Sequence, residues 1–205
     1  MDKLHIFYEA INNHYLLSEL DGADLLQEYN EIETNKVKQL IDTNSNWIVN
    51  DYPRFFNALK KTTRPEFFTP HTVQEFKDLG VTTYLLNGYN IGYALMPEPD
   101  GNVSIISIFN NEKEVKGVVD NILQSAIKNG GTQLDHYGVD ALNQAYGRNG
   151  FEEYDRYKWD DRYASPMWDY KKYGRPDVVL RRYNKAKSNN TTLTEFYDLL
   201  RRMDK

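Results

Sequence analysis

The sequence of 205 residues contains no cysteine. Disulfide bonds, thiolate metal sites and a catalytic cysteine are therefore excluded. Histidine is scarce, with four residues, and none of them stands in a spacing such as H-E-x-x-H. The pattern therefore predicts no metal site.

Long hydrophobic runs are missing as well. No window approaches the roughly 20 apolar residues that a transmembrane helix needs. The N-terminal segment carries polar residues throughout, which is unlike the apolar core of a signal peptide. We therefore expect no membrane association, and the cytoplasm is the predicted compartment.

Positive charge is not in excess either. With 25 Lys and Arg against 30 Asp and Glu, the net charge is -5, which gives no general attraction to nucleic acid. The basic segments near the C-terminus are better explained as solvated faces, so we expect no nucleic-acid partner. The chain is instead rich in apolar residues, with 40% hydrophobic and 14% aromatic residues, and this composition excludes a disordered chain.

Residues 1–64 have helical periodicity and form a predicted N-terminal helical extension. Apolar residues recur at spacings of three and four from Leu4 to Tyr15 and again from Leu25 to Ile41. The extension carries no catalytic pattern. Three roles are open for the extension: a dimerisation surface that makes a homo-oligomer, a module that binds a protein partner, or packing for the rest of the fold.

The hydrophobic period changes to two beyond Pro65 and Pro70. This change predicts an α/β domain over residues 65–183, followed by a linker and a terminal helix over 184–205. Strands are predicted over 81–86, 91–97, 102–109, 132–138, 151–159 and 177–183, and helices over 71–80, 112–131 and 139–150. After its first helix the domain therefore reads β-β-β-α-β-α-β-β.

The second half of this pattern contains Tyr146-Gly147-Arg148-Asn149-Gly150-Phe151, where a helix meets a strand. It resembles the Y-x-x-x-G-F signature of the GCN5-related N-acetyltransferase (GNAT) superfamily, whose order of elements also matches residues 70–183. The wider pattern, with "SAIKNGGTQLDHYG" and "GRPDVVL", resembles GNAT-like proteins encoded by bacteriophages. For such a protein the predicted compartment is the cytoplasm of the bacterial host.

The resemblance implies acetyl-CoA as cofactor and assigns roles to several residues. The strand Ser104–Phe109 would splay from its neighbour, so that Ile108 and Phe109 contact the pantetheine arm. The turn Val115, Lys116, Gly117 and Val118 would hold the pyrophosphate, as helix N-termini can. Tyr146 would be the general acid that protonates the thiolate, although a packed aromatic residue is an equal alternative.

The turn departs from the family pattern Q/R-x-x-G-x-G/A in two places. Glu114 replaces the basic or amide residue, and Val119 replaces the second small residue. A carboxylate beside a pyrophosphate is repulsive, while Lys113 and Lys116 compensate for part of that charge. The asparagine that usually stands seven positions before the tyrosine is Val139 here.

A general base would have to deprotonate an amine, directly or through water. Asp135 and His136, on the strand 132–138, are the candidates by topology. Successive strand residues face opposite sides, so at most one of them readily faces a cleft. The alternative for both is structural, as a surface carboxylate and a half-buried histidine.

The long loop after Trp159 carries Tyr163, Trp168, Tyr170 and Tyr173 among charged residues. It is either a binding surface or a lid that packs its own aromatic rings on the sheet. The resemblance to the GNAT superfamily implies an acyl-CoA-dependent N-acyltransferase with an amine acceptor. The alternative is a catalytically inactive GNAT-like phage protein that binds a host or virion protein.

Overall fold

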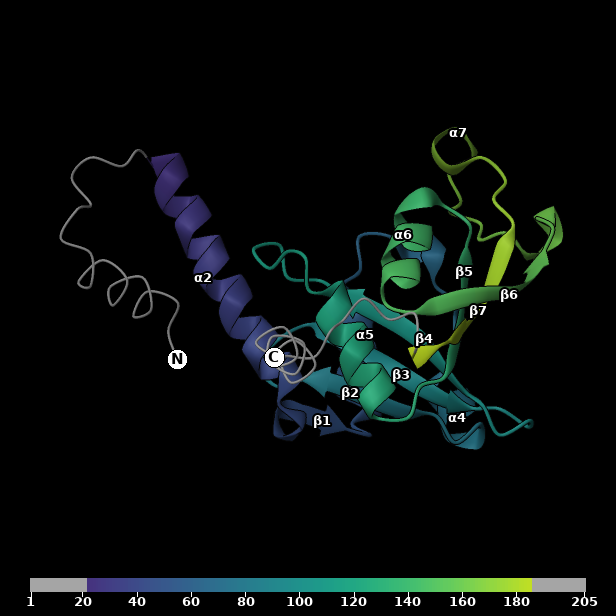
Figure 1. Cartoon of the computed structure of the whole chain (residues 1–205), viewed down its shortest axis with the longest axis horizontal. Helices are drawn as coiled ribbons and strands as arrows, with labels where there is room; N and C mark the ends of the chain where they lie inside the picture. The colour runs from purple at the N-terminus through teal and green to yellow at the C-terminus, as the bar shows by residue number, and fades with distance from the viewer. Residues whose placement is uncertain (1–21, 186–205) are drawn as a thin grey trace, which may run out of the picture.

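The computed structural model describes residues 22–185, with side chains described from residue 26 on. The first predicted helix and the C-terminal helix lie outside the described residues. Seven strands form one sheet in the order β1-β2-β3-β4-β5-β7-β6, in which only the β4–β5 neighbours are parallel (Figure 1). The strands are β1 (Trp47–Val49), β2 (Thr82–Leu86), β3 (Ile91–Pro97), β4 (Val103–Asn110), β5 (Gln133–Tyr137), β6 (Phe151–Tyr157) and β7 (Val178–Tyr183).

Helices cover both faces of the sheet, and each face has its own core. The helices are α2 (Gly22–Asp42), α3 (Tyr52–Leu59), α4 (Val73–Asp78), α5 (Val119–Lys128), α6 (Asp140–Arg148) and α7 (Tyr170–Tyr173), with 3-10 turns η1 (Asn44–Asn46), η2 (Pro65–Phe67) and η3 (Asp161–Tyr163). One core joins α2, α5 and α6 to the sheet around Tyr93, Ile105 and Leu134. The other joins α3 and α4 to it around Ala94 and Phe109. We call the side of the sheet with the first core the α5 face and the side with the second core the α3 face.

The structure confirms the predicted fold class, a mixed α/β sheet whose elements from β2 onward follow the predicted order β-β-β-α-β-α-β-β. Two details differ. Within the predicted helical extension, Trp47–Val49 forms a strand and α3 packs in the core of the α3 face. The helix predicted over 112–131 begins only at Val119, because Gly117 has a φ of +63° that a right-handed helix does not accept.

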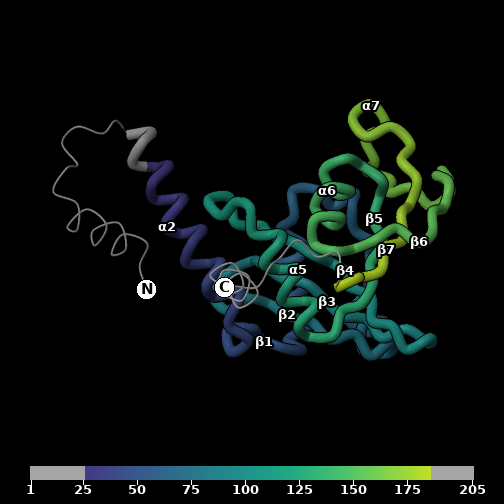
Figure 2. The backbone as a smooth tube through the Cα atoms, viewed as in Figure 1, coloured from purple at the N-terminus to yellow at the C-terminus, as the bar shows by residue number. Residues whose placement is uncertain are grey.

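Helix α2 is the part of the predicted extension that leaves the body of the molecule (Figures 1 and 2). Near its C-terminal end, Val37 and Ile41 are fully buried in the core of the α5 face. Near its other end, Leu26 and Ile32 are 57% and 42% exposed. The domain boundaries at residues 64 and 183 stay predictions.

The turn at Gly150 joins α6 to β6 and builds the fold. Gly150 has a φ of +85°, the left-handed conformation that stops a helix. Its amide donates to the carbonyl of Gly147, and its carbonyl accepts from the amide of Asn184. The next residue, Phe151, is 1% exposed and packs in the core of the α5 face.

We expect Gly150→Ala to lower the free energy of unfolding by about 1–2 kcal/mol, because an L-residue pays that much in the left-handed region. Gly147→Ala is the matched control, since Gly147 lies within α6 at ordinary φ with only Arg181 Nη1 near a built Cβ, at 3.9 Å. Alanine there should raise stability by roughly 0.5–1 kcal/mol. Urea denaturation measures both, and equal effects would contradict the assigned role of Gly150.

Candidate functional site

A gap opens in the sheet between β4 and β5. These parallel neighbours share a single bridged pair, Ser104 with Gln133, at the beginning of both strands. Further along, β4 has a bulge where Ser107 takes a φ of +50°, unusual for a residue with a side chain. The chain then leaves β4 toward α2 and leaves β5 toward α6 (Figure 2). Beyond the first pair, the facing edges therefore have no ladder partner across the gap.

The predicted contact residues of β4 divide between the two faces. Ile108 packs against the core of the α5 face. Phe109 turns to the α3 face, where its ring lies 5.3 Å from that of Phe55. The side chain of Phe109 is therefore a core residue, and only Ile108 stands on the side of the sheet that α5 and α6 cover.

Tyr146 lies on α6 against the same face. Its side chain is 9% exposed, and its ring packs on those of His136 and Phe151, at 4.8 and 6.4 Å between centroids. Burial raises the pKa of Tyr146 to about 12, with a smaller contribution from the charge of Asp135. Its hydroxyl therefore stays protonated over the physiological range and can act as a hydrogen-bond donor.

His136 belongs to a satisfied network. Its Nδ1–H donates to the carbonyl of Tyr137 at 2.7 Å, and its Nε2 accepts from Arg181 Nε at 2.9 Å. Arg181 also donates to the carbonyl of Phe151 and to the side chain of Asn143. Burial, opposed by the bond to Tyr137, lowers the pKa of His136 to about 4. Since both ring nitrogens are engaged, His136 supports the ring of Tyr146 and has no lone pair left to accept a substrate proton.

Asp135 faces the other way. It is exposed while its neighbours Leu134 and His136 are buried, so β5 turns its carboxylate to the α3 face. Desolvation by the surrounding protein raises its pKa, and the charge of Glu98 adds to this. The exposed carboxylate of Asp135 therefore remains accessible to water on the α3 face. A raised pKa of this kind suits a general base.

The predicted pyrophosphate turn has two buried anchors and an exposed tip. Val115 and Val118 are 1% and 2% exposed and belong to the core, whereas Lys116 and Gly117 lie at the surface. A built Cβ on Gly117 meets no atom within 4 Å, so a ligand has room there. The amide of Lys116 donates to Thr34 Oγ1 of α2 at 3.2 Å, a contact that the sequence did not reveal.

Arg148 is a further residue that the sequence reasoning missed. Its guanidinium reaches from the end of α6 to Asp120 in the first turn of α5, at 2.8–3.0 Å. Asn149 donates to the same carboxylate at 2.6 Å. The guanidinium of Arg148 therefore supplies a positive charge at the N-terminus of α5. The predicted pyrophosphate turn before this helix has Glu114 in place of a basic or amide residue. In the sequence, only its position inside the Y-x-x-x-G-F segment marked Arg148 as a candidate site residue.

The loop after Trp159 is a lid of packed aromatic rings, as one of the two interpretations predicted. Trp168 is 6% exposed and packs on Tyr137, Trp159, Phe67 and Tyr173, with centroids 4.5–5.4 Å apart. The indole N–H of Trp168 donates to the carbonyl of Gly174 at 3.0 Å. The lid thus closes over Tyr137, which lies two residues from Asp135 and on the same side of β5.

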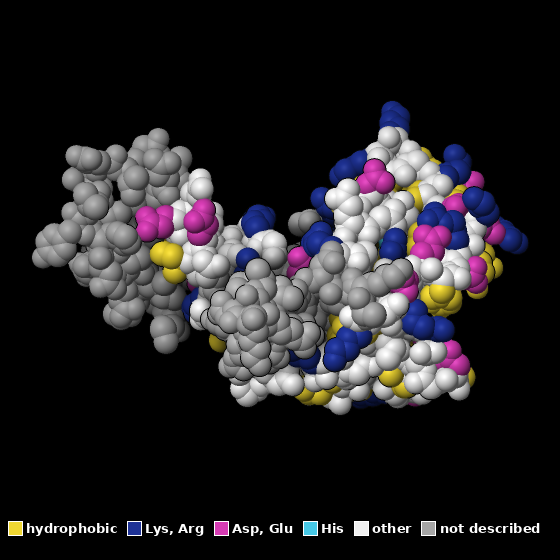
Figure 3. Space-filling model, in the orientation of Figure 1, with side chains coloured by type: hydrophobic (Ala, Val, Ile, Leu, Met, Phe, Trp, Pro, Cys, Tyr) yellow, Lys and Arg dark blue, Asp and Glu magenta, His cyan; other side chains and the backbone are white. Residues whose placement is uncertain are grey.

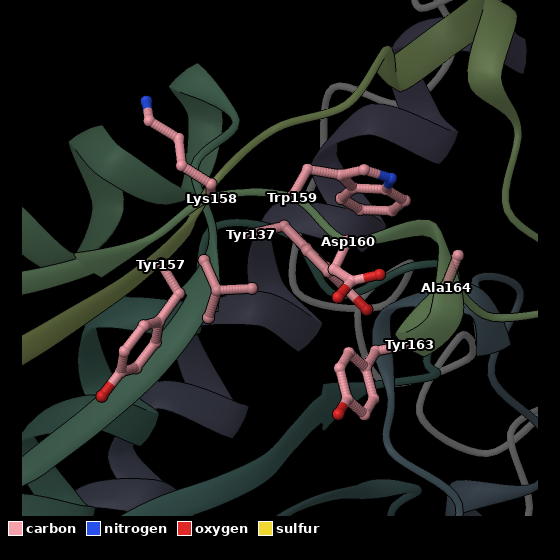
Figure 4. Close-up of a pocket in the computed structure, with 8 residues that line it drawn as sticks. Tyr137, Tyr157, Lys158, Trp159, Asp160, Tyr163 and Ala164 are labelled. Carbon is pink, nitrogen blue, oxygen red and sulfur yellow. The ribbon is translucent and has the colours of Figure 1, made fainter.

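A cavity of about 450 Å³ remains beside the lid (Figure 4). It lies between the end of β6, the first residue of β7 and the segment that opens the loop. Its wall consists of Tyr137, Tyr157, Lys158, Trp159, Asp160, Tyr163, Ala164 and Val178. Four of these eight residues are aromatic, and Lys158 and Asp160 contribute one charge of each sign, so the wall is mostly apolar.

Charge is intermixed on the face shown in Figure 3, where basic and acidic side chains alternate over the lobe that carries α6 and β6. Within residues 22–185, no group of three or more His, Asp or Glu could hold a metal ion. No helix in that part of the chain is long and apolar enough to cross a membrane.

Comparisons with known proteins give structural neighbours only. No protein-family model matches the chain, and no curated protein matches it. A GNAT family acetyltransferase from Elizabethkingia anophelis with acetyl-CoA bound is 16% identical and covers 68% of this chain and 98% of its own, with a TM-score of 0.45. A Bacillus subtilis acetyltransferase in complex with CoA is 16% identical and covers 57% and 95%, with a TM-score of 0.39. Both scores lie below 0.5, so the functional interpretation rests on the geometry of this chain.

The buried state of His136 should make stability depend on pH. Its pKa is about 4 in the folded chain and about 6.5 when exposed, so the unfolded chain binds a proton that the folded chain refuses. The contribution is present above pH 6.5 and is lost as the pH falls toward 4, by about 3 kcal/mol.

Urea denaturation across this pH window measures the effect. We expect His136→Gln to flatten the decline relative to the parent chain. His71→Gln is the control, because His71 precedes α4 and lies outside this network. Parallel curves for the parent chain and His136→Gln would contradict the assignment.

Proposed function

We propose that the protein is an acyl-CoA-dependent N-acyltransferase that acts on an amine. The observation that carries this proposal is the gap between β4 and β5, with Tyr146 on the α5 face and Asp135 on the α3 face. A hydrogen-bond donor on one side of an opening in a sheet and a carboxylate on the other suit a transfer between two substrates that approach from opposite faces.

The described residues fit acetyl-CoA. Along the gap, the edges of β4 and β5 have backbone N–H and C=O groups without a ladder partner. These groups can hydrogen-bond the amides of the extended pantetheine arm, as an exposed strand edge binds an added strand. At the far end, the open space at Gly117 and the guanidinium of Arg148 would take the pyrophosphate at the N-terminus of α5. Glu114 and Asp120 oppose this binding, and Lys113 and Lys116 offset part of their charge.

When bound, acetyl-CoA supplies the thioester carbonyl that the amine attacks. Asp135, from the α3 face, takes the proton that the amine must lose, directly or through water, and its raised pKa strengthens it as a base. Tyr146 donates a hydrogen bond to the leaving sulfur. Because a thiol with a pKa of about 8.5 is a stronger acid than Tyr146, the proton that completes the thiol comes finally from solvent.

The second candidate is a GNAT-like protein without catalysis that binds a protein partner, encoded by a phage. The bond between Thr34 and the amide of Lys116 favours it, because it occupies an N–H that a pyrophosphate would need. The ion pair between Asp120 and Arg148 favours it for the same reason, since a phosphate would have to displace the carboxylate.

Calorimetric titration with acetyl-CoA separates the two. We expect the parent chain to bind and Arg148→Glu to weaken binding roughly 10- to 100-fold, because a charge-assisted hydrogen bond becomes a repulsion. Arg54→Glu is the matched control, since Arg54 is an exposed residue of α3 paired with Asp51. Tyr146→Phe should bind normally and reduce kcat about 100-fold.

Turnover is measured as thiol released from acetyl-CoA over a panel of amines, with no background from the chain because it contains no cysteine. No heat at high ligand concentration, together with an unchanged melting temperature, would exclude the transferase. Equal weakening by Arg148→Glu and Arg54→Glu would remove Arg148 from the cofactor site.

A general base at Asp135 should be visible in the pH dependence of kcat/KM. The rate constant kcat/KM should rise with pH through the raised pKa of Asp135, because only the carboxylate accepts the proton. Asp135→Asn should lower kcat/KM about 100-fold or more and remove this limb of the profile. Glu98→Gln is the informative partner variant, since losing its charge should move the limb to lower pH. A limb that persists unchanged in Asp135→Asn would assign the base to another group.

A further inference from the structure

Arg181 lies on β7 and turns its side chain to the α5 face. It stands opposite Leu134 of β5, and residues opposite each other in an antiparallel pair share a face of the sheet. Leu134 packs in the core of the α5 face, which α6 also covers (Figure 1). A Cβ built on Gly147 of α6 would lie 3.9 Å from Arg181 Nη1. The guanidinium therefore lies between the sheet and α6, beside the turn of helix that carries Tyr146.

The three hydrogen bonds of this guanidinium surround Tyr146. Nε donates to Nε2 of His136, and Nη1 donates to the carbonyl of Phe151, both at 2.9 Å. The rings of these two residues both pack on the ring of Tyr146. Nη2 donates to Oδ1 of Asn143 at 3.0 Å, about one helical turn before Tyr146. One planar group thus joins the strand beneath Tyr146, the helix that carries it and the strand that follows it.

The chemistry of these bonds requires a guanidinium. Its five N–H donors point in fixed directions in one plane, whereas a lysine ammonium is a compact donor on a flexible chain. All three acceptors of Arg181 are neutral, so none of these bonds compensates its charge. Burial lowers the pKa of Arg181, and the charge of Glu153 opposes part of this effect. A partly buried cation that faces neutral acceptors contributes fixed geometry rather than a strong net attraction.

We propose that Arg181 is the positioning residue for Tyr146, and that its guanidinium holds α6 and the ring of His136 so that Tyr146 keeps one orientation against β5. The effect on turnover rests on the proposed function, whereas the fixed orientation does not. Arg181 acts through the residues that it binds and does not touch a substrate. A phenol held in this way meets the leaving sulfur without first ordering its own side chain, which lowers the barrier through orientation.

NMR spectroscopy of the full chain without ligand tests the positioning itself. The ring centroids of His136 and Tyr146 lie 4.8 Å apart, so a nuclear Overhauser effect between their ring protons is expected. Arg181→Lys keeps the charge but cannot serve three acceptors in three directions, so it should lose this signal. Asn143→Ala removes one acceptor and places a good helix former in α6, so it should fold and weaken the signal.

The absence of the signal in the parent chain, or its persistence at full strength in both variants, would overturn the proposal. Arg182→Lys is the matched control, because Arg182 is the exposed neighbour of Arg181 on β7 and its guanidinium lies 4.5 Å from the ring centroid of Tyr154. Strand alternation places it on the face of the sheet opposite to Tyr146. This variant should keep the signal and the rate of the parent chain. Loss of the signal in Arg182→Lys as well would reveal a general loosening of β7 and contradict a specific role of Arg181.

Thiol release from acetyl-CoA separates positioning from a general loss of structure. Arg181→Lys should lower kcat about tenfold and leave the KM for acetyl-CoA within about twofold, because the orientation of Tyr146 affects the chemical step rather than binding. In a Tyr146→Phe background the same substitution should lower kcat no further, since it acts only through the phenol. Equal effects of Arg181→Lys in the two backgrounds would overturn the proposal. A parent chain that releases no thiol would reject the transferase, and the ring contact alone would then decide the role of Arg181.

Discussion

The bulge at Ser107 is the constraint on which the site depends. It shifts the register of β4 against β3, and β4 and β5 remain joined by a single bridge at Ser104. Full pairing would close the sheet and separate Tyr146 from Asp135 by a continuous layer of backbone. The distortion persists because both faces are held by cores: Ile105 is fixed on the α5 face, and Phe109 is fixed on the α3 face against Phe55.

Periodicity predicted most of the fold, and its failures have simple causes. Trp47–Val49 is too short to show an alternation, and only pairing with β2 makes it a strand. Before α5, Val115 and Val118 stand at a helical spacing, yet they anchor an irregular loop, since burial alone does not distinguish the two. The alternation along β5 allowed at most one of Asp135 and His136 to face a cleft, but which side each residue takes is visible only in the packing of α6 against His136.

The parts of the site that the sequence concealed are contacts between distant segments. Arg148 meets Asp120 across 28 residues, and Thr34 meets Lys116 across 82. No local pattern carries such information, because both pairs depend on how α2, α5 and α6 are packed. The same holds for the cavity, whose aromatic residues come from β5, β6 and the lid.

The hydrogen bond between Thr34 and the amide of Lys116 ties the turn to α2. The N-terminal part of α2 extends from the body, while Val37 and Ile41 near its C-terminal end anchor the helix in the core of the α5 face. If a ligand at the turn competes for this amide, its affinity and the docking of α2 are linked by one coupling free energy, equal in both directions. A protein that grips the protruding half of α2 would then be an allosteric effector of the turn, acting without any contact with the ligand.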